Sequence, residues 1–193
     1  MKHVIFVLIY FIFTSSAFSE NVEFNSSSRY NIRFEPLRLA VNNFSINVLD
    51  IKVSSNWTVG PELGYLKYSV SSAGNSSSMI YVDTSFIGVR TNWFKNGVYT
   101  DGLYIAPFTR FAKTDITAPS GSTIAGKASS SVLGCFFGYG WFWNNFNMML
   151  GISPVIASNW SPVVVTDQTG FNTNHLSDRF AHAAGEYALG WTF

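Results

Sequence analysis

The stretch GEYALGWTF, residues 185–193, decides the fold class because its large side chains occupy every second position. Large apolar residues alternate with small or polar ones up to the last residue, Phe193. In a β-strand, residues at alternate positions lie on opposite faces. The stretch therefore predicts a strand with one large apolar face and one face of small or polar side chains.

The same alternation recurs in three segments upstream, residues 57–69, 128–141 and 146–158. Their second face carries mainly Gly, Ser, Asn and Glu, which are too small or too polar to fill the interior of a sandwich. Such a face fits the inside of a narrow barrel whose large apolar face contacts lipid, the reverse of a soluble sheet. We predict an all-β fold, an eight-stranded antiparallel transmembrane β-barrel.

The lengths of the connections support this prediction independently. We expect strands at residues 30–41, 44–53, 57–69, 79–93, 98–112, 128–141, 146–158 and 180–193. Counted back from the last strand, the connections alternate between long and short, except for a short one at residues 42–43. Short periplasmic turns and long extracellular loops are typical of bacterial outer-membrane barrels. With both termini of the chain in the periplasm, the long connections fall on the extracellular side.

Composition narrows the class of protein further. Of 193 residues, 47% are hydrophobic and only 12% are charged, against about 25% charged in a typical soluble domain. The net charge is +1 without a basic patch, which gives no indication of nucleic-acid binding. Cys135 is the single cysteine and no zinc-type spacing occurs, so we expect no disulfide, metal or cofactor.

The N-terminal segment MKHVIFVLIYFIFTSSAFSE has the three parts of a secretory signal peptide. Lys2 is followed by the apolar run 4–13 and by the small-residue site Ala17-Phe18-Ser19. We predict a signal peptide at residues 1–19, a lead at 20–29 and the barrel at 30–193. The alternative, a membrane anchor, is disfavoured because the apolar run is too short to span a bilayer.

Aromatic residues gather at the turn ends of the predicted strands. The expected periplasmic aromatic girdle consists of Trp57, Trp93, Trp141, Trp143 and Trp191, together with Phe94, Phe142 and Phe193. The alternative interpretation is ordinary core packing, but core aromatics would not collect at one end of every hairpin.

Several charged residues fall on the predicted inner face. They are Glu62, Arg90, Arg110 and Glu186, with Arg33 and Glu35 as further candidates. An eight-stranded barrel has room inside only for side chains, and a lone buried charge is very unfavourable. We therefore expect an ion-pair network that plugs the lumen, and we favour structural pairing over a gate.

The ending EYALGWTF resembles the C-terminal signal of outer-membrane proteins, in which a polar residue and a glycine precede two alternating aromatics. Glu186, Trp191 and Phe193 match that pattern, whereas Ala188 stands where glycine is usual. The architecture resembles small barrels of the OmpA/OmpX kind, and the hairpin at 44–68 resembles small bacterial barrel families of unassigned function. The resemblance implies the bacterial outer membrane, recognition by the barrel assembly machinery, contact with lipid and lipopolysaccharide, and a monomer.

Two other classes of protein compete with this interpretation. The pair His175 and Ser177 resembles the His-x-Ser pair of outer-membrane lipid A deacylases, in which a histidine base activates a serine. Only one strand fits after it here, whereas a further loop and strand follow it in those enzymes. A secreted lipocalin-like barrel that holds a small ligand would need the opposite alternation. We expect a non-enzymatic barrel whose external loops serve adhesion or envelope integrity.

Overall fold

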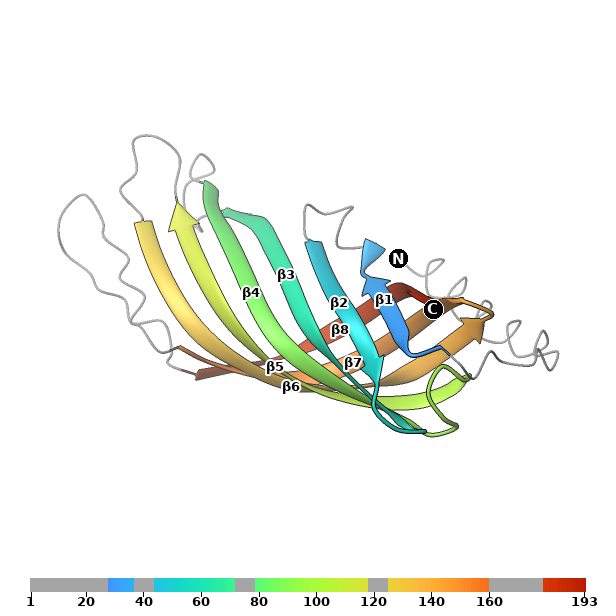
Figure 1. Cartoon of the computed structure of the whole chain (residues 1–193). Coiled ribbons are helices and arrows are strands. Elements are labelled where there is room, and N and C mark those ends of the chain that lie inside the picture. The colour runs from blue at the N-terminus through green and yellow to red at the C-terminus, as the bar shows by residue number, and fades with distance from the viewer. Residues whose placement is uncertain (1–27, 37–43, 72–78, 118–124, 160–178) are drawn as a thin grey trace, which may run out of the picture.

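Eight antiparallel strands form a closed barrel in the computed structural model of this chain (Figure 1). The structure describes residues 28–36, 44–71, 79–117, 125–159 and 179–193. Its strands are β1 Tyr30–Phe34, β2 Phe44–Lys52, β3 Trp57–Ser71, β4 Met79–Phe94, β5 Gly102–Thr117, β6 Ala125–Trp143, β7 Phe146–Asn159 and β8 Arg179–Thr192. Each strand pairs with its neighbours in the chain, and β1 pairs with β8 to close the ring. The predicted eight-stranded antiparallel all-β architecture is confirmed.

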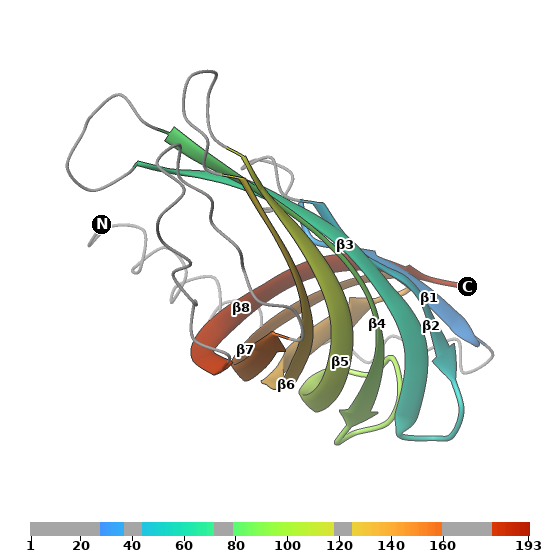
Figure 2. The same cartoon turned by 90° about the vertical axis from the view of Figure 1, so that its left-hand side faces the viewer.

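The strands differ strongly in length. β4 and β5 have 16 residues each and β6 has 19, whereas β1 has 5. The long strands β3–β6 reach well beyond β1 at one end of the barrel (Figures 1 and 2). No helix of the described segments is long and apolar enough to cross a bilayer.

Several predicted strand boundaries differ from the structure, and the largest differences are in the first and fifth strands. The first strand ends at Phe34 rather than continuing toward residue 41, and Pro36, which cannot donate a backbone hydrogen bond, follows soon after. The fifth strand runs from Gly102 to Thr117 rather than from Val98 to Ala112. Residues 95–101 form a turn instead, in which Gly97 and Tyr99 have φ angles of 107° and 63°. This backbone conformation does not continue a strand.

Burial alternates along the strands with the large apolar side chains outside. On β5, Leu103, Ile105 and Phe111 are exposed, whereas Tyr104 and Arg110 between them are buried. At about 3.3 Å per residue the outward segment from Leu103 to Phe111 extends ~27 Å along the strand. Tilted by roughly 40°, it spans about 20 Å along the barrel axis, against about 25 Å for the apolar band of membrane barrels.

The apolar band ends abruptly toward the long connections. Beyond it, the outer surface of β3–β6 carries charged residues in two cross-strand pairs. Lys67 lies 3.7 Å from Asp83, and Lys127 lies 3.8 Å from Asp115. Ion pairs as exposed as these are typical of surface in contact with water. The outer surface of the barrel therefore changes from apolar to polar along the length of the same strands.

Three exposed prolines, Pro61, Pro107 and Pro154, lie within β3, β5 and β7. A proline inside a sheet lacks the donor that the ladder needs, so it is usually found at an edge or a bulge. Here the ladder on one side of each proline has a register shift or skips residues. At Pro154, the N–H of Cys135 donates instead to Ser153 Oγ at 3.0 Å.

A bulge in β2 explains which of its residues face inward. Asn47 pairs with Glu62 and Ile51 pairs with Val59, so four residues of β2 lie opposite only three residues of β3. Glu62 is buried on the inner face of β3, and Val59, three residues away, lies on the outer face. The register shift between Asn47 and Ile51 therefore reverses the phase of the strand and places Asp50 inside.

Aromatic side chains close the barrel at its short-turn end. Phe94 and Phe142 are 1% and 6% exposed, with ring centroids 5.9 Å apart, so both differ from the predicted outward girdle and face inward. Their neighbours Trp93 and Trp143 take the outward positions of the alternation, which sends these phenylalanines inside. Tyr99 of the β4–β5 turn packs 6.0 Å from the Phe142 ring and donates a 3.3 Å hydrogen bond to the Asp50 carbonyl.

Tyr99 keeps its proton in this position. Burial, and then the nearby Asp50 carboxylate, raises the pKa of the Tyr99 phenol above its usual value. The hydroxyl therefore remains a hydrogen-bond donor at neutral pH, and the turn stays attached to β2.

Candidate functional site

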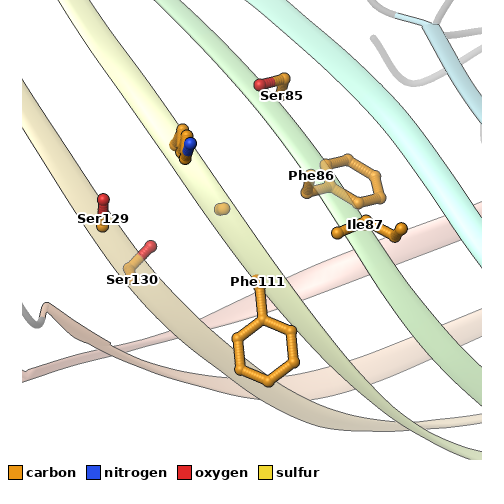
Figure 3. Close-up of a pocket in the computed structure, with 8 residues that line it drawn as sticks. Ser85, Phe86, Ile87, Phe111, Ser129 and Ser130 are labelled. Carbon is orange, nitrogen blue, oxygen red and sulfur yellow. The ribbon is translucent and has the colours of Figure 1, made fainter.

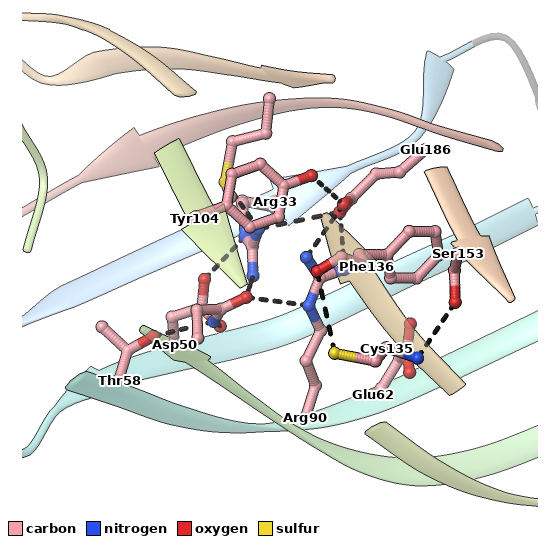
Figure 4. Close-up of polar contacts among 12 residues, drawn as sticks. Arg33, Asp50, Thr58, Glu62, Arg90, Tyr104, Cys135, Phe136, Ser153 and Glu186 are labelled. Carbon is pink, nitrogen blue, oxygen red and sulfur yellow. Dashed lines mark hydrogen bonds and ion pairs between the residues drawn. The ribbon is translucent and has the colours of Figure 1, made fainter. Parts of the chain in front are cut away.

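The Glu186 carboxylate on β8 is the centre of a polar network inside the barrel (Figure 4). The guanidinium of Arg90 on β4 donates to both carboxylate oxygens, at 2.6 and 2.9 Å. The hydroxyl of Tyr104 on β5 donates to the same carboxylate at 2.5 Å. Arg33 Nη1 on β1 lies 3.7 Å from Glu186 Oε1. One carboxylate thus connects strands that are far apart around the ring.

A second carboxylate, that of Asp50 on β2, extends the network. Arg33 Nε lies 2.6 Å from Asp50 Oδ2, and the amide of Asn92 donates to Asp50 Oδ1 at 3.1 Å. The same amide donates to Thr58 Oγ1 at 2.8 Å, and the Asn92 oxygen accepts from Arg90 Nε at 2.8 Å. Asn92 therefore joins the Asp50 group to the Glu186 group.

A separate ion pair is formed by Arg110 on β5 and Glu62 on β3. Arg110 Nε and Nη2 donate to the two oxygens of Glu62 at 2.7 and 2.5 Å. The Arg110 guanidinium also lies 4.2 Å from the ring centroid of Phe108 and 4.8 Å from that of Phe86. A bidentate pair between aromatic faces fixes the guanidinium in one orientation.

Aromatic rings connect the two polar groups. The rings of Phe108 and Phe136 stack at 5.1 Å, and the Arg90 guanidinium lies 4.9 Å from the Phe136 centroid. Guanidinium groups and rings therefore alternate from Arg110 to Arg90, a favourable arrangement in a desolvated interior. Among the described residues, these side chains lie in the middle of the barrel, where eight strands leave little other room.

Two glycines make room for Tyr104. A Cβ atom at Gly138 or Gly151 would overlap the Tyr104 hydroxyl, which donates to Glu186. These positions therefore need a residue without a side chain for the network to form.

We expect Gly151→Ala to lower the free energy of unfolding by about 1–3 kcal/mol, because the added methyl displaces the Tyr104 hydroxyl. Gly185→Ala on β8 is the matched control, since nothing lies within 4 Å of a Cβ there. A urea titration of the refolded protein compares the two variants. Equal stability of both variants would contradict the close packing around Tyr104.

The structure places all four predicted lumen residues inside the barrel, as two groups rather than one. Glu62 pairs with Arg110, and Glu186 pairs with Arg90. Of the further candidates, Arg33 joins the Glu186 group and Glu35 is buried at 6% exposure. Four members of the network, Asp50, Thr58, Asn92 and Tyr104, were not among the residues predicted from the sequence. A charged residue within the apolar segment 44–52 was a signal for Asp50, but the bulge in β2 hid its direction.

Four of the five predicted girdle tryptophans lie on the outer surface near the short turns. Trp57, Trp143 and Trp191 are 44%, 41% and 56% exposed, and Trp93 pairs with Trp57 across β3 and β4. The Trp143 ring stacks on Phe146 at 5.9 Å, and Phe146 pairs with Trp191. Trp141 lies on the same face of β6 as Tyr139 and Trp143, but it is only 8% exposed, with its ring 4.8 Å from that of Tyr139.

The C-terminal residue contributes to closure of the ring. The Phe193 carbonyl accepts hydrogen bonds from the N–H groups of Arg29 and Tyr30, both at 3.1 Å. Its own N–H donates to the Tyr30 carbonyl at 2.9 Å, and the two rings lie 5.8 Å apart. Recognition of Glu186, Trp191 and Phe193 by an assembly machinery stays a prediction.

Three predicted features lie outside the described residues, namely the signal peptide at 1–19, the lead up to residue 27 and the His175/Ser177 pair. Within the described segments, no group of three or more His, Cys, Asp or Glu side chains could hold a metal ion. Comparison of the chain with protein-family models, with curated proteins and with solved structures found no match.

Proposed function

We propose that this chain is an integral β-barrel of the bacterial outer membrane with a plugged lumen, and that it acts through its surface rather than as an enzyme or a pore. The observation that carries the proposal is the reversed polarity of the barrel. Ile152, Ile156 and Leu133 are 71%, 59% and 57% exposed, whereas Arg33, Glu62 and Arg90 are almost completely buried. A barrel surrounded by water would leave these apolar residues unfavourably solvated.

The boundaries of the apolar surface also support a membrane position. Exposed tryptophans border the apolar band at the short-turn end, and the Lys67–Asp83 and Asp115–Lys127 pairs lie beyond its other end. Aromatic belts at the interface and charged residues beyond it are typical of membrane barrels. A lipocalin-like carrier of a small ligand would instead need an apolar interior free to take up that ligand.

The proposed role is structural or adhesive, through the segments on the long-connection side. The lumen supports a role without transport, because Arg90, Arg110 and their carboxylates occupy it together with Phe108 and Phe136. The proposed partners are outer-membrane lipid and lipopolysaccharide, with assembly machinery recognising the last strand. The lipid A deacylase alternative depends on His175 and Ser177, which lie outside the described residues.

We expect the mature protein to begin at Glu20 and to be recovered with outer membranes after cell fractionation, because the signal segment directs export. N-terminal sequencing of the membrane-extracted protein measures the cleavage point. A periplasmic soluble protein fractionated in parallel is the control. Recovery of this chain in the same soluble fraction as that control would exclude a location in the outer membrane.

A further inference from the structure

A row of three polar residues crosses the outer face of the barrel at the end of the apolar band. Lys113 on β5 is the direct partner of Ser85 on β4 and of Ser129 on β6. In the next row toward the centre of the band, Phe111 pairs with Ile87. A row with one lysine and two serines therefore borders an apolar row, at the level where the outer surface changes from apolar to polar.

A concavity of about 360 Å³ lies across these two rows (Figure 3). Its lining includes Lys113, Ser85 and Ser129 on the polar side and Phe111 and Ile87 on the apolar side. Phe111 and Ile87 are 51% and 57% exposed, so the apolar part of the concavity is open to the surroundings of the barrel.

Lys113 is the unbalanced charge of this surface. The other two lysines nearby each have a carboxylate, Lys67 with Asp83 at 3.7 Å and Lys127 with Asp115 at 3.8 Å. Lys113 forms no ion pair within the described residues, and its cross-strand partners are hydroxyl groups that can donate hydrogen bonds. One ammonium between two hydroxyls matches a phosphate group, which accepts several charge-assisted hydrogen bonds.

We propose that Lys113, Ser85 and Ser129 bind the phosphorylated headgroup of a membrane lipid, and that its acyl chain lies on Phe111 and Ile87. The apolar row selects a lipid over a free anion, because a soluble phosphate would use only the polar row. This site depends on the proposed membrane position, since only then does the apolar row lie at the edge of the hydrocarbon. It adds a binding site for one class of lipid to a surface that otherwise only excludes water.

The test uses the full mature protein inserted in lipid nanodiscs, with lipid exchange followed by native mass spectrometry. We expect wild type to retain phosphatidic acid over phosphatidylcholine of the same chains, and Lys113→Gln to lower this preference by about fivefold. Lys127→Gln is the matched control, because Lys127 is 90% exposed and has its own carboxylate partner. Its preference should equal that of wild type.

Four outcomes overturn the site. Equal losses in Lys113→Gln and Lys127→Gln would show a general charge effect, and no loss in either would show no site at Lys113. Complete displacement of the retained lipid by millimolar inorganic phosphate would show that a free anion suffices. Phe111→Ser is the second variant. If it retains phosphatidic acid as well as wild type does, the acyl chain does not contact Phe111. Failure of the wild-type chain to insert at all would instead contradict the proposed function.

Discussion

The Glu186→Gln variant should either lose about 3–5 kcal/mol of stability or begin to conduct ions. Removing one member of a buried ion pair leaves the partner charge uncompensated in a low-dielectric interior. Here the change affects two arginines, Arg90 with two hydrogen bonds to the carboxylate and Arg33 at 3.7 Å. If water enters to solvate them, the filled lumen opens, and steady conductance appears in planar bilayers.

Asp115→Asn is the matched control for Glu186→Gln. Asp115 is also paired, but its side chain is 59% exposed and its pair with Lys127 is solvated, so its removal should change stability by less than about 1 kcal/mol. Wild type should show little steady conductance. A wild-type protein that already forms a large stable pore would contradict the plugged lumen. A Glu186→Gln variant with wild-type stability and conductance would refute the ion-pair network but not the barrel fold.

The Ile152→Arg variant should lose about 2–4 kcal/mol of stability when the barrel is refolded into lipid, as expected for an arginine near the bilayer midplane. Ile152 is 71% exposed and lies on β7 between Phe146, which stacks on Trp143 at the short-turn end, and Ile156, near the other end of the band. On a water-exposed surface the same substitution would change stability only slightly. The measurement is a denaturant titration in lipid vesicles.

Thr117→Arg provides the comparison, because Thr117 is exposed at the end of β5, beyond Lys113 and Asp115. An arginine there should change stability by less than about 0.5 kcal/mol. Equal effects of the two substitutions would show that the apolar band does not face hydrocarbon.

The alternation of large and small residues was enough to predict the barrel, because a period of two defines both faces of a strand without knowledge of its partners. It also gave the inward direction of Glu62, Arg90, Arg110 and Glu186, which lie in regular strands. The positions of Trp57, Trp143 and Trp191 followed from their places at the ends of hairpins.

Features that depend on three-dimensional contacts could not be predicted. Asp50 faces inward only because a bulge shifts the register of β2. The inward turn with Tyr99 depends on positive φ angles at residues 97 and 99, which a strand pattern does not reveal. Arg90 and Glu186 are 96 positions apart in the chain, so their pairing depends on the fold and is not apparent from the sequence.

Cys135 offers the most direct measurement of the central claim that the apolar band contacts lipid. It is the single cysteine of the chain, it is partly exposed, and it pairs with the exposed Pro107 on the outer face. A nitroxide attached to Cys135 in vesicles should collide often with oxygen and rarely with a water-soluble nickel chelate. In a Cys135→Ser background, a label at Thr117→Cys should show the opposite preference. Equal access of the nickel chelate to both labels would contradict a membrane-spanning barrel.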